Sequence, residues 1–354
     1  MTVRGWSHDG PIGQGYCRRR HRTDHLSAWC RLQRNQRGGG AGGVPSGASL
    51  SDPGGSERIL GAWLEGWRQL VEIHPTLEEN SVSKIVIGTT GGQHSPTAGA
   101  RVGDGLRHRF GGAELVLTSD VVVAHAGALG GEPGVVTVSG TGAVALAVSE
   151  DGSYRLVDGH GPFLGDDGSG FAIGRRGLRA VLRHLDGRPG GSSALSERAT
   201  EMWALDDMVD TIQSSPGAVR AIASFANEVI EVAESGDPVA EGIVTEAVGH
   251  LADTTQIAIE SLSDGKTKIP VALKGSVFTG GRLIEELVSR ELTKRHSDVV
   301  MKVPSGDALE GALLLGRDHA GIHESLMIRA TRQPTSDRGV ATAGVMGANP
   351  RRKK

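Results

Sequence analysis

The sequence predicts an α/β fold, most simply arranged as two lobes. Short β-type apolar runs alternate along the chain with stretches of helical periodicity, which is typical of strands covered by helices. Two neighbouring runs, at 143–148 and 153–157, flank a polar turn and predict a hairpin between such units. Glycine accounts for 54 of 354 residues, and the excess falls at the ends of the runs, where tight turns and backbone-lined ligand loops occur.

Composition narrows the class of protein. A net charge of −3, with 22% charged residues, gives no reason to expect a nucleic-acid or membrane partner. No apolar run approaches the roughly 20 residues that span a bilayer, and the first thirty residues lack the apolar centre of a signal peptide. The two cysteines, Cys17 and Cys30, form no disulfide framework or cysteine-rich metal site. We therefore expect a cytoplasmic protein.

The element pattern starts near Ser56. Residues 1–55 carry almost no apolar periodicity and are predicted to be irregular, whereas apolar residues at three- and four-residue spacing from Ile59 onward predict an amphipathic helix. Strands are predicted at 84–88, 114–120 and 134–140, with a buried helix from Asp120. Residues 217–262 predict helices broken at 236–238, followed by a strand at 268–275 and by helices at about 281–292 and at 308–315.

Two glycine-rich turns follow predicted strands. In the first, Gly140-Thr141-Gly142, backbone N–H groups can turn toward one point and bind an anion, although an ordinary hairpin turn explains the triplet alone better. In the second, the run from Gly165 to Gly170, Asp166 and Asp167 could accept hydrogen bonds from sugar hydroxyls or meet a hydrated magnesium ion. Its alternative is an Asx turn that caps the following helix.

Two further stretches occupy strand ends. Asp120 follows Thr118 and Ser119 at the end of a predicted strand, where a carboxylate could accept the proton of a substrate hydroxyl during phosphoryl transfer. An N-cap is the competing role, and both can coexist. The run from Lys274 to Gly281 passes from a strand into a glycine-rich turn that could lie against an adenosine, or could simply connect a strand to a helix.

In their order and spacing these stretches resemble the N-acetylglucosamine kinase family of the actin-like sugar kinases, which share their fold with the activating ATPases of benzoyl-CoA reductase. The resemblance covers residues 84–320 and includes P-S-G-D-A-L-E-G-A-L-L-L-G at 304–316. It implies a two-lobed actin-like ATPase (ribonuclease H-like) α/β fold with an interlobe cleft. The implied boundaries are 56–118 for the N-terminal lobe, 119–305 for the C-terminal lobe, 306–322 for a helix that returns to the first lobe, and 323–354 for a mobile tail.

The resemblance also implies roles for individual residues. Asp120 would be the catalytic base in ATP-dependent phosphorylation of an amino sugar, N-acetylglucosamine or glucosamine, at the 6-hydroxyl. ATP and Mg²⁺ are the implied cofactors, no residue is assigned as a metal ligand, and a homodimer is compatible with the family. The sugar-binding residues would be Ser119, His160, Gly165 and Asp166, and the ATP-binding residues Gly140, Thr141, Gly142, Gly275, Ser276 and Gly280.

One departure from the family is serious. Its first phosphate loop, a strand running into D-G-G-G-T or D-G-G-T, is absent before residue 84. Codons for Tyr16 to Arg22, read one base later, permit Ile, Val or Ala, Asp, Gly, Gly, Thr, Gly, so we interpret this stretch as out of frame. A GC-rich gene permits many such readings, which is the alternative. Without this loop, the chain as written is expected to have little kinase activity.

Two other functions stay open on the sequence. An activating ATPase of the benzoyl-CoA reductase type would need cysteines for an iron–sulfur cluster, and none follows residue 30. A non-catalytic sugar-binding protein would fit a chain that keeps the sugar loop and lacks the first phosphate loop. ATP dependence of sugar binding would separate these functions from a kinase.

Overall fold

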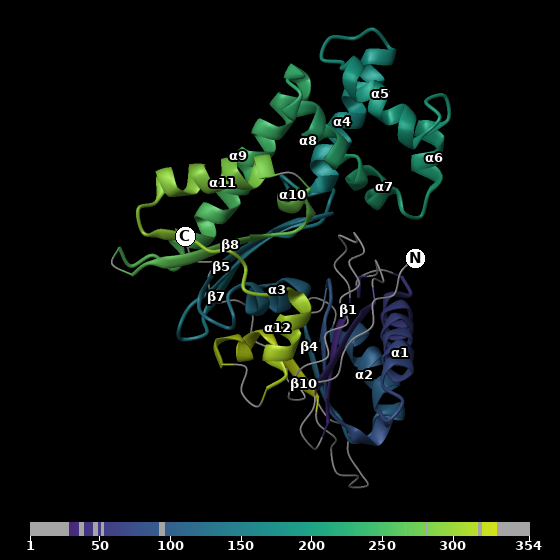
Figure 1. The fold of residues 1–354 in the computed structure, drawn as a ribbon, viewed down its shortest axis with the longest axis vertical. Helices are drawn as coiled ribbons and strands as arrows, with labels where there is room; N and C mark the ends of the chain where they lie inside the picture. Colours follow the sequence, from purple (N-terminus) through teal and green to yellow (C-terminus); the bar gives the residue numbers. More distant parts are fainter. Residues whose placement is uncertain are drawn as a thin grey trace, which may run out of the picture.

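The computed structural model describes residues 28–34, 39–44, 49–50, 53–91, 96–265, 267–280, 282–317 and 321–330. These residues form two five-stranded sheets with a pair of helices between them (Figure 1). The stretch from Tyr16 to Arg22, where we interpret the reading frame as altered, lies outside the described residues.

The first sheet has the strand order β10-β4-β3-β1-β2. Only β3 and β4 are parallel, and the other neighbours in this sheet are antiparallel. Helices α1 and α2 pack on this sheet through an aromatic cluster in which the rings of Trp63 and Phe110 meet edge to face at 4.9 Å. The strands and helices are β1 Ala28–Arg34, β2 Gly39–Val44, α1 Gly55–Ile73, η1 Glu79–Ser81, β3 Val82–Gly88, α2 Pro96–Arg109, β4 Glu114–Thr118 and β10 Ile328–Ala330.

The second sheet has the order β7-β6-β5-β8-β9. Strands β5, β6 and β7 form an antiparallel meander that includes the predicted hairpin, and β8 and β9 add in parallel. A layer of helices covers one face of this sheet and closes the larger core (Figure 1). The elements are β5 Gly134–Ser139, β6 Ala143–Val148, β7 Tyr154–Asp158, α4 Gly170–Leu185, α5 Ser193–Met202, α6 Met208–Ser214, α7 Ala218–Ser224, α8 Ala226–Glu234, α9 Pro238–Glu260, β8 Ile269–Lys274, α10 Ser276–Thr279, α11 Arg282–Arg295 and β9 Val299–Met301.

Helices α3 (Asp120–Ala128) and α12 (Ala308–Leu315) lie between the two sheets and share one core with both. They cross closely because each contributes a glycine: a Cβ at Gly127 would lie 1.9 Å from the carbonyl oxygen of Asp307, and a Cβ at Gly311 1.8 Å from that of Val123. Every residue of α3 is buried, as expected for a helix whose residues other than Asp120 and His125 are apolar or glycine. The predicted helices from Asp120 and over 308–315 are confirmed.

Residues 321–330 extend the first sheet. They form the 3₁₀-helix η2 (Gly321–Leu326) and strand β10, which pairs antiparallel with β4. Thr118 Oγ1 donates a hydrogen bond of 2.7 Å to the carbonyl of Leu326, and Arg329 forms an ion pair of 2.6 Å with Glu114. We expected a mobile tail from residue 323, and 323–330 differ from that expectation: residues 323–326 belong to η2, and residues 328–330 pair with the edge of β4 as a strand.

The remaining differences are elements of the structure that the sequence did not predict. The sequence pattern did not predict α2, α4, α5 or α6, and it placed β1 and β2 in an irregular region. No helix in the part of the chain that the structure describes combines the length and the apolar character needed to cross a membrane.

Candidate functional site

The predicted phosphate turn and the predicted adenosine loop meet at the ends of two parallel strands. Strands β5 and β8 pair side by side, and the turn at 140–142 and the loop at 275–280 follow them directly. Gly275 has φ +108°, and a Cβ there would lie 2.2 Å from the carbonyl oxygen of Ser139. Only glycine permits this contact, so the backbone of one loop packs against the start of the other.

The phosphate turn is also joined to the predicted sugar loop through the backbone. Gly170 N donates to the carbonyl of Gly140 at 2.7 Å, and Phe171 N donates to that of Thr141 at 3.3 Å. Ser139 Oγ donates to the carbonyl of Gly168 at 3.1 Å. A simple hairpin turn would not need these bonds, so the two glycine-rich stretches form one structural unit.

Asp166 is buried at the junction of this unit. Its residue is 7% exposed, and its φ of +58° lies in the left-handed region. Gly161 N donates to Asp166 Oδ1 at 3.2 Å, and a Cβ at Gly142 would lie 2.6 Å from Oδ2. Burial raises the pKa of Asp166 to about 6 against the backbone hydrogen bonds, which favour the charged form. The carboxyl therefore changes charge close to neutral pH.

The other predicted sugar-loop residues differ in their placement. His160 is exposed, and its positive form would favour the charged state of Asp166. Gly165 has no room for a side chain, because a Cβ there would lie 2.4 Å from Asp158 Oδ1. Asp158 is not among the residues predicted from the sequence, although it stands at the end of β7 immediately before the loop.

Asp120 is the first residue of α3 and is 8% exposed. Its carboxylate accepts hydrogen bonds from Thr90 Oγ1 at 2.5 Å and from Val121 N at 2.7 Å. Burial raises the pKa of Asp120, and these two bonds act in the opposite direction. A raised pKa makes the carboxylate a stronger proton acceptor, and a neighbouring hydroxyl shows that the position suits an O–H donor.

Ser119 occupies the N-cap position of α3 without making a side-chain cap. Its Oγ is buried and has no hydrogen-bond partner within the described residues. A buried hydroxyl without a partner is costly unless a ligand or water satisfies it. Thr90 is not among the residues predicted from the sequence. It follows β3 in the run G-T-T-G-G, which is a glycine-rich strand end like those of the predicted site.

The remaining predicted ATP residues lie along α10. Ser276 begins this short helix, and its Oγ would be 3.6 Å from a Cβ on Gly140. Gly280 follows the helix, and a Cβ there would lie 2.6 Å from Asn227 Oδ1 on α8. The structure thus brings the predicted ATP residues and the sugar loop together, whereas Asp120 and Ser119 are held at the end of β4.

A dedicated magnesium cage is not found in the described ranges, where no three His, Cys, Asp or Glu side chains are placed to hold a metal ion. Magnesium in phosphate chemistry usually takes one or two carboxylates together with waters and phosphate oxygens. A magnesium ion that arrives with a nucleotide therefore needs fewer protein ligands than the cluster of three that the described residues lack.

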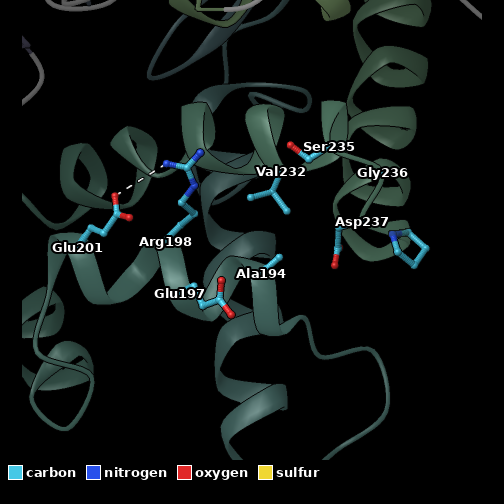
Figure 2. A pocket seen from close by; sticks show the side chains of 9 residues that line it. Ala194, Glu197, Arg198, Glu201, Val232, Ser235, Gly236 and Asp237 are labelled. Atoms are coloured by element: carbon cyan, nitrogen blue, oxygen red, sulfur yellow. Dashed lines mark ion pairs between the residues drawn. The ribbon is translucent and has the colours of Figure 1, made fainter.

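A pocket of about 520 Å³ lies between α5 and the turn from α8 to α9, and Figure 2 shows the side chains that line it. None of the predicted site residues lines it. Arg198 on its wall forms ion pairs with Glu231 at 3.0 Å, with Glu228 at 3.4 Å and with Glu201 at 3.8 Å, so its positive charge is more than offset by carboxylates. The pocket is separate from the glycine-rich unit described above.

Two sheets around a buried helix pair, with glycine-rich loops gathered at the strand ends, define an actin-like ATPase of two-lobed α/β fold. The chain belongs to the BadF/BadG/BcrA/BcrD ATPase family, whose model matches residues 72–316. This confirms the family that the sequence motifs indicated.

Two curated relatives have assigned activities. The chain is 26% identical over 251 residues to the N-acetylmuramic acid/N-acetylglucosamine kinase of Clostridium acetobutylicum, covering 70% of this chain and 81% of the relative. It is 28% identical over 203 residues to the N-acetyl-D-glucosamine kinase of Dictyostelium discoideum, covering 56% of this chain and 63% of that relative.

Solved structures share the fold. A Chromobacterium violaceum protein assigned as an N-acetylglucosamine kinase superposes with a TM-score of 0.61 at 23% identity, covering 82% of this chain and all of that one. A Porphyromonas gingivalis protein with the same assignment gives 0.58 at 16% identity, covering 79% and 92%.

Proposed function

We propose that the chain carries the site of an amino-sugar kinase, which transfers the γ-phosphoryl group of ATP to the 6-hydroxyl of N-acetylglucosamine or glucosamine. The observation that carries the proposal is the backbone union of the phosphate turn with the loop that holds Asp166. Because the turn and the loop are joined, a nucleotide phosphate bound by the turn and a sugar hydroxyl bound by Asp166 would lie close together. Membership of an ATPase family and similarity to two amino-sugar kinases support the same reaction.

Asp120 is proposed as the general base. The sugar hydroxyl would hydrogen-bond to its carboxylate, as the Thr90 hydroxyl does, and transfer its proton there as the oxygen attacks the γ-phosphorus. The bond from the γ-phosphorus to the bridging oxygen breaks, and ADP leaves. Because Asp120 is buried, its charge is poorly screened and its raised pKa favours proton uptake.

Binding is proposed for the remaining predicted residues. Asp166, with Ser119, His160 and Gly165, would hold the sugar, and Gly140, Thr141, Gly142, Gly275, Ser276 and Gly280 would line the ATP site. Magnesium would arrive on the nucleotide phosphates, where it neutralises their charge. The enzyme would act in the cytoplasm, alone or as a homodimer.

A non-catalytic sugar-binding role is the second candidate, favoured by the missing first phosphate loop. Under the kinase proposal, the chain as written is expected to transfer phosphate slowly, because an Asp-Gly-Gly loop is not available to the β- and γ-phosphates.

The test follows ADP release with N-acetylglucosamine, with glucosamine and without sugar, and assigns the phosphorylated oxygen by NMR. For a chain whose first phosphate loop is restored, the proposal predicts sugar-dependent ADP release and a 6-phosphate product, whereas the chain as written should release little ADP. Phosphate on another oxygen would contradict the proposed position, and ADP release that ignores the sugar would contradict the reaction.

A further inference from the structure

The loop between β7 and α4 is built on an unusual backbone. Asp158, at its start, and Asp166, four residues before α4, have φ of +63° and +58° and are the two non-glycine residues with positive φ in the described part of the chain. Left-handed backbone is costly for a residue with a side chain, and such positions persist where the surroundings enforce them. Glycines with φ of +77° and +86° stand between them at positions 159 and 161.

Asp158 uses its side chain to close this loop. Its Oδ1 accepts a hydrogen bond from Asp166 N at 2.8 Å, and its Oδ2 accepts one from Asp167 N at 3.1 Å. The carboxylate fills the space beside Gly165, where a Cβ would come within 2.4 Å of Oδ1. The start of the loop is therefore tied to its end by a charged acceptor across eight residues.

The closure continues to the phosphate turn. Gly161 N donates to Asp166 Oδ1, and Asp166 Oδ2 lies against Gly142. Asp158 thus fixes the backbone of the residue whose carboxylate packs on the turn. A glycine would adopt the φ of Asp158 without strain, so the turn alone does not require an aspartate.

We propose that Asp158 is a positioning residue, which holds the sugar loop closed so that Asp166 is presented to the amino sugar. The inference rests on the proposed function. The two hydrogen bonds that the Asp158 carboxylate accepts offset the cost of its strained backbone. Without them, the amides of Asp166 and Asp167 would lose their acceptors.

The experiment compares Asp158→Gly, Asp158→Asn and a control, Asp151→Gly, in the full chain. Asp151 sits in the turn between β6 and β7, where its carboxylate accepts a hydrogen bond from Ser153 N at 2.9 Å. Asp158→Gly relieves the backbone and removes both acceptors. Asp158→Asn keeps one acceptor oxygen and tolerates positive φ.

Two readouts are needed. One is amide hydrogen exchange of peptides covering 158–170, and the other is calorimetric affinity for N-acetylglucosamine and, separately, for ADP. Asp158→Gly should speed exchange and weaken sugar binding by about tenfold or more, with a smaller change for ADP. Asp158→Asn should recover part of both losses, and Asp151→Gly should match the wild type in both.

Wild-type exchange and wild-type sugar affinity in Asp158→Gly would overturn the proposal, because only the backbone conformation would then matter at this position. Absence of sugar binding by every protein, the wild type included, would contradict the proposed function. Hydrogen exchange would still decide in that case whether Asp158 closes the loop.

Discussion

The buried imidazole of His125 is expected to lower the stability of the folded chain in mild acid, and the structure allows the size of this loss to be estimated. The imidazole lies on α3, is fully buried and has Nε2 3.0 Å from the carbonyl of Gly134. A carbonyl only accepts, so Nε2 carries the proton and Nδ1 accepts from His323 Nε2 at 2.9 Å. A second proton on the His125 ring would face the donor nitrogen of His323. Burial, together with the neighbouring His323, lowers the pKa of His125 from 6.5 to about 3.

The sign follows from proton uptake by the unfolded chain. Below pH 6.5 the unfolded His125 binds a proton that the folded imidazole refuses, so the stability present above pH 6.5 is lost as the pH falls toward 3. The gap between the two pKa values corresponds to about 5 kcal/mol at its limit, and to about 2 kcal/mol at pH 5. Buried carboxyls such as Asp120, with raised pKa, act in the opposite direction, so a variant comparison is needed.

The assay is urea unfolding of the wild type and of His125→Gln at pH 7.5 and pH 5. Glutamine keeps an amide donor for the carbonyl of Gly134 and cannot titrate. The wild type should lose about 2 kcal/mol more unfolding free energy between the two pH values than the variant does. An equal loss in both proteins would refute the assignment of His125 as a buried neutral imidazole.

Three further predictions concern the site. Asp120→Asn should lower sugar phosphorylation by roughly 10²-fold or more while the fold persists, as general-base loss does; an unchanged rate in an active enzyme would leave Asp120 only a structural role at the start of α3. Asp166→Ala should weaken N-acetylglucosamine binding in calorimetry with little effect on ADP, and an equal loss of both would make the loop structural. Gly142→Ala would place a Cβ 2.6 Å from Asp166 Oδ2 and should weaken sugar and ADP binding together, whereas Gly61→Ala, with open space around it, should change neither; wild-type affinities in Gly142→Ala would show that the turn and loop need not touch.

Sequence periodicity predicted the elements whose burial is simple. Helix α3, the helix at 308–315 and the central hairpin follow directly from apolar runs and turn residues. Helix α2 was missed because its sequence carries three glycines, which lower helix propensity. All three, Gly99, Gly103 and Gly105, pack closely against neighbours, since a Cβ would come within 2.4 Å of Leu117, 2.9 Å of Leu115 and 2.4 Å of Leu60, respectively. Tertiary contact overrides local preference there.

Tertiary contacts also limited how much of the site could be predicted from the sequence. The motif residues at the strand ends could be named from sequence, because carboxylates and glycines following apolar runs are visible there. The contacts of Thr90 with Asp120 and of Asp158 with the sugar loop could not, because each joins residues whose chain separation carries no periodic signal. β10 is a three-residue strand and is too short for an alternating pattern.

The most direct test of the central claim compares the chain as written with one whose codons for residues 16–36 are restored to the frame that encodes Asp-Gly-Gly-Thr-Gly. Both are assayed by coupled ADP release with N-acetylglucosamine and glucosamine. We predict little or no sugar-dependent release by the chain as written and recovered phosphorylation by the restored chain. Strong activity in the chain as written would contradict the out-of-frame interpretation. Absence of amino-sugar phosphorylation in a folded, restored chain would contradict the assignment of the site itself.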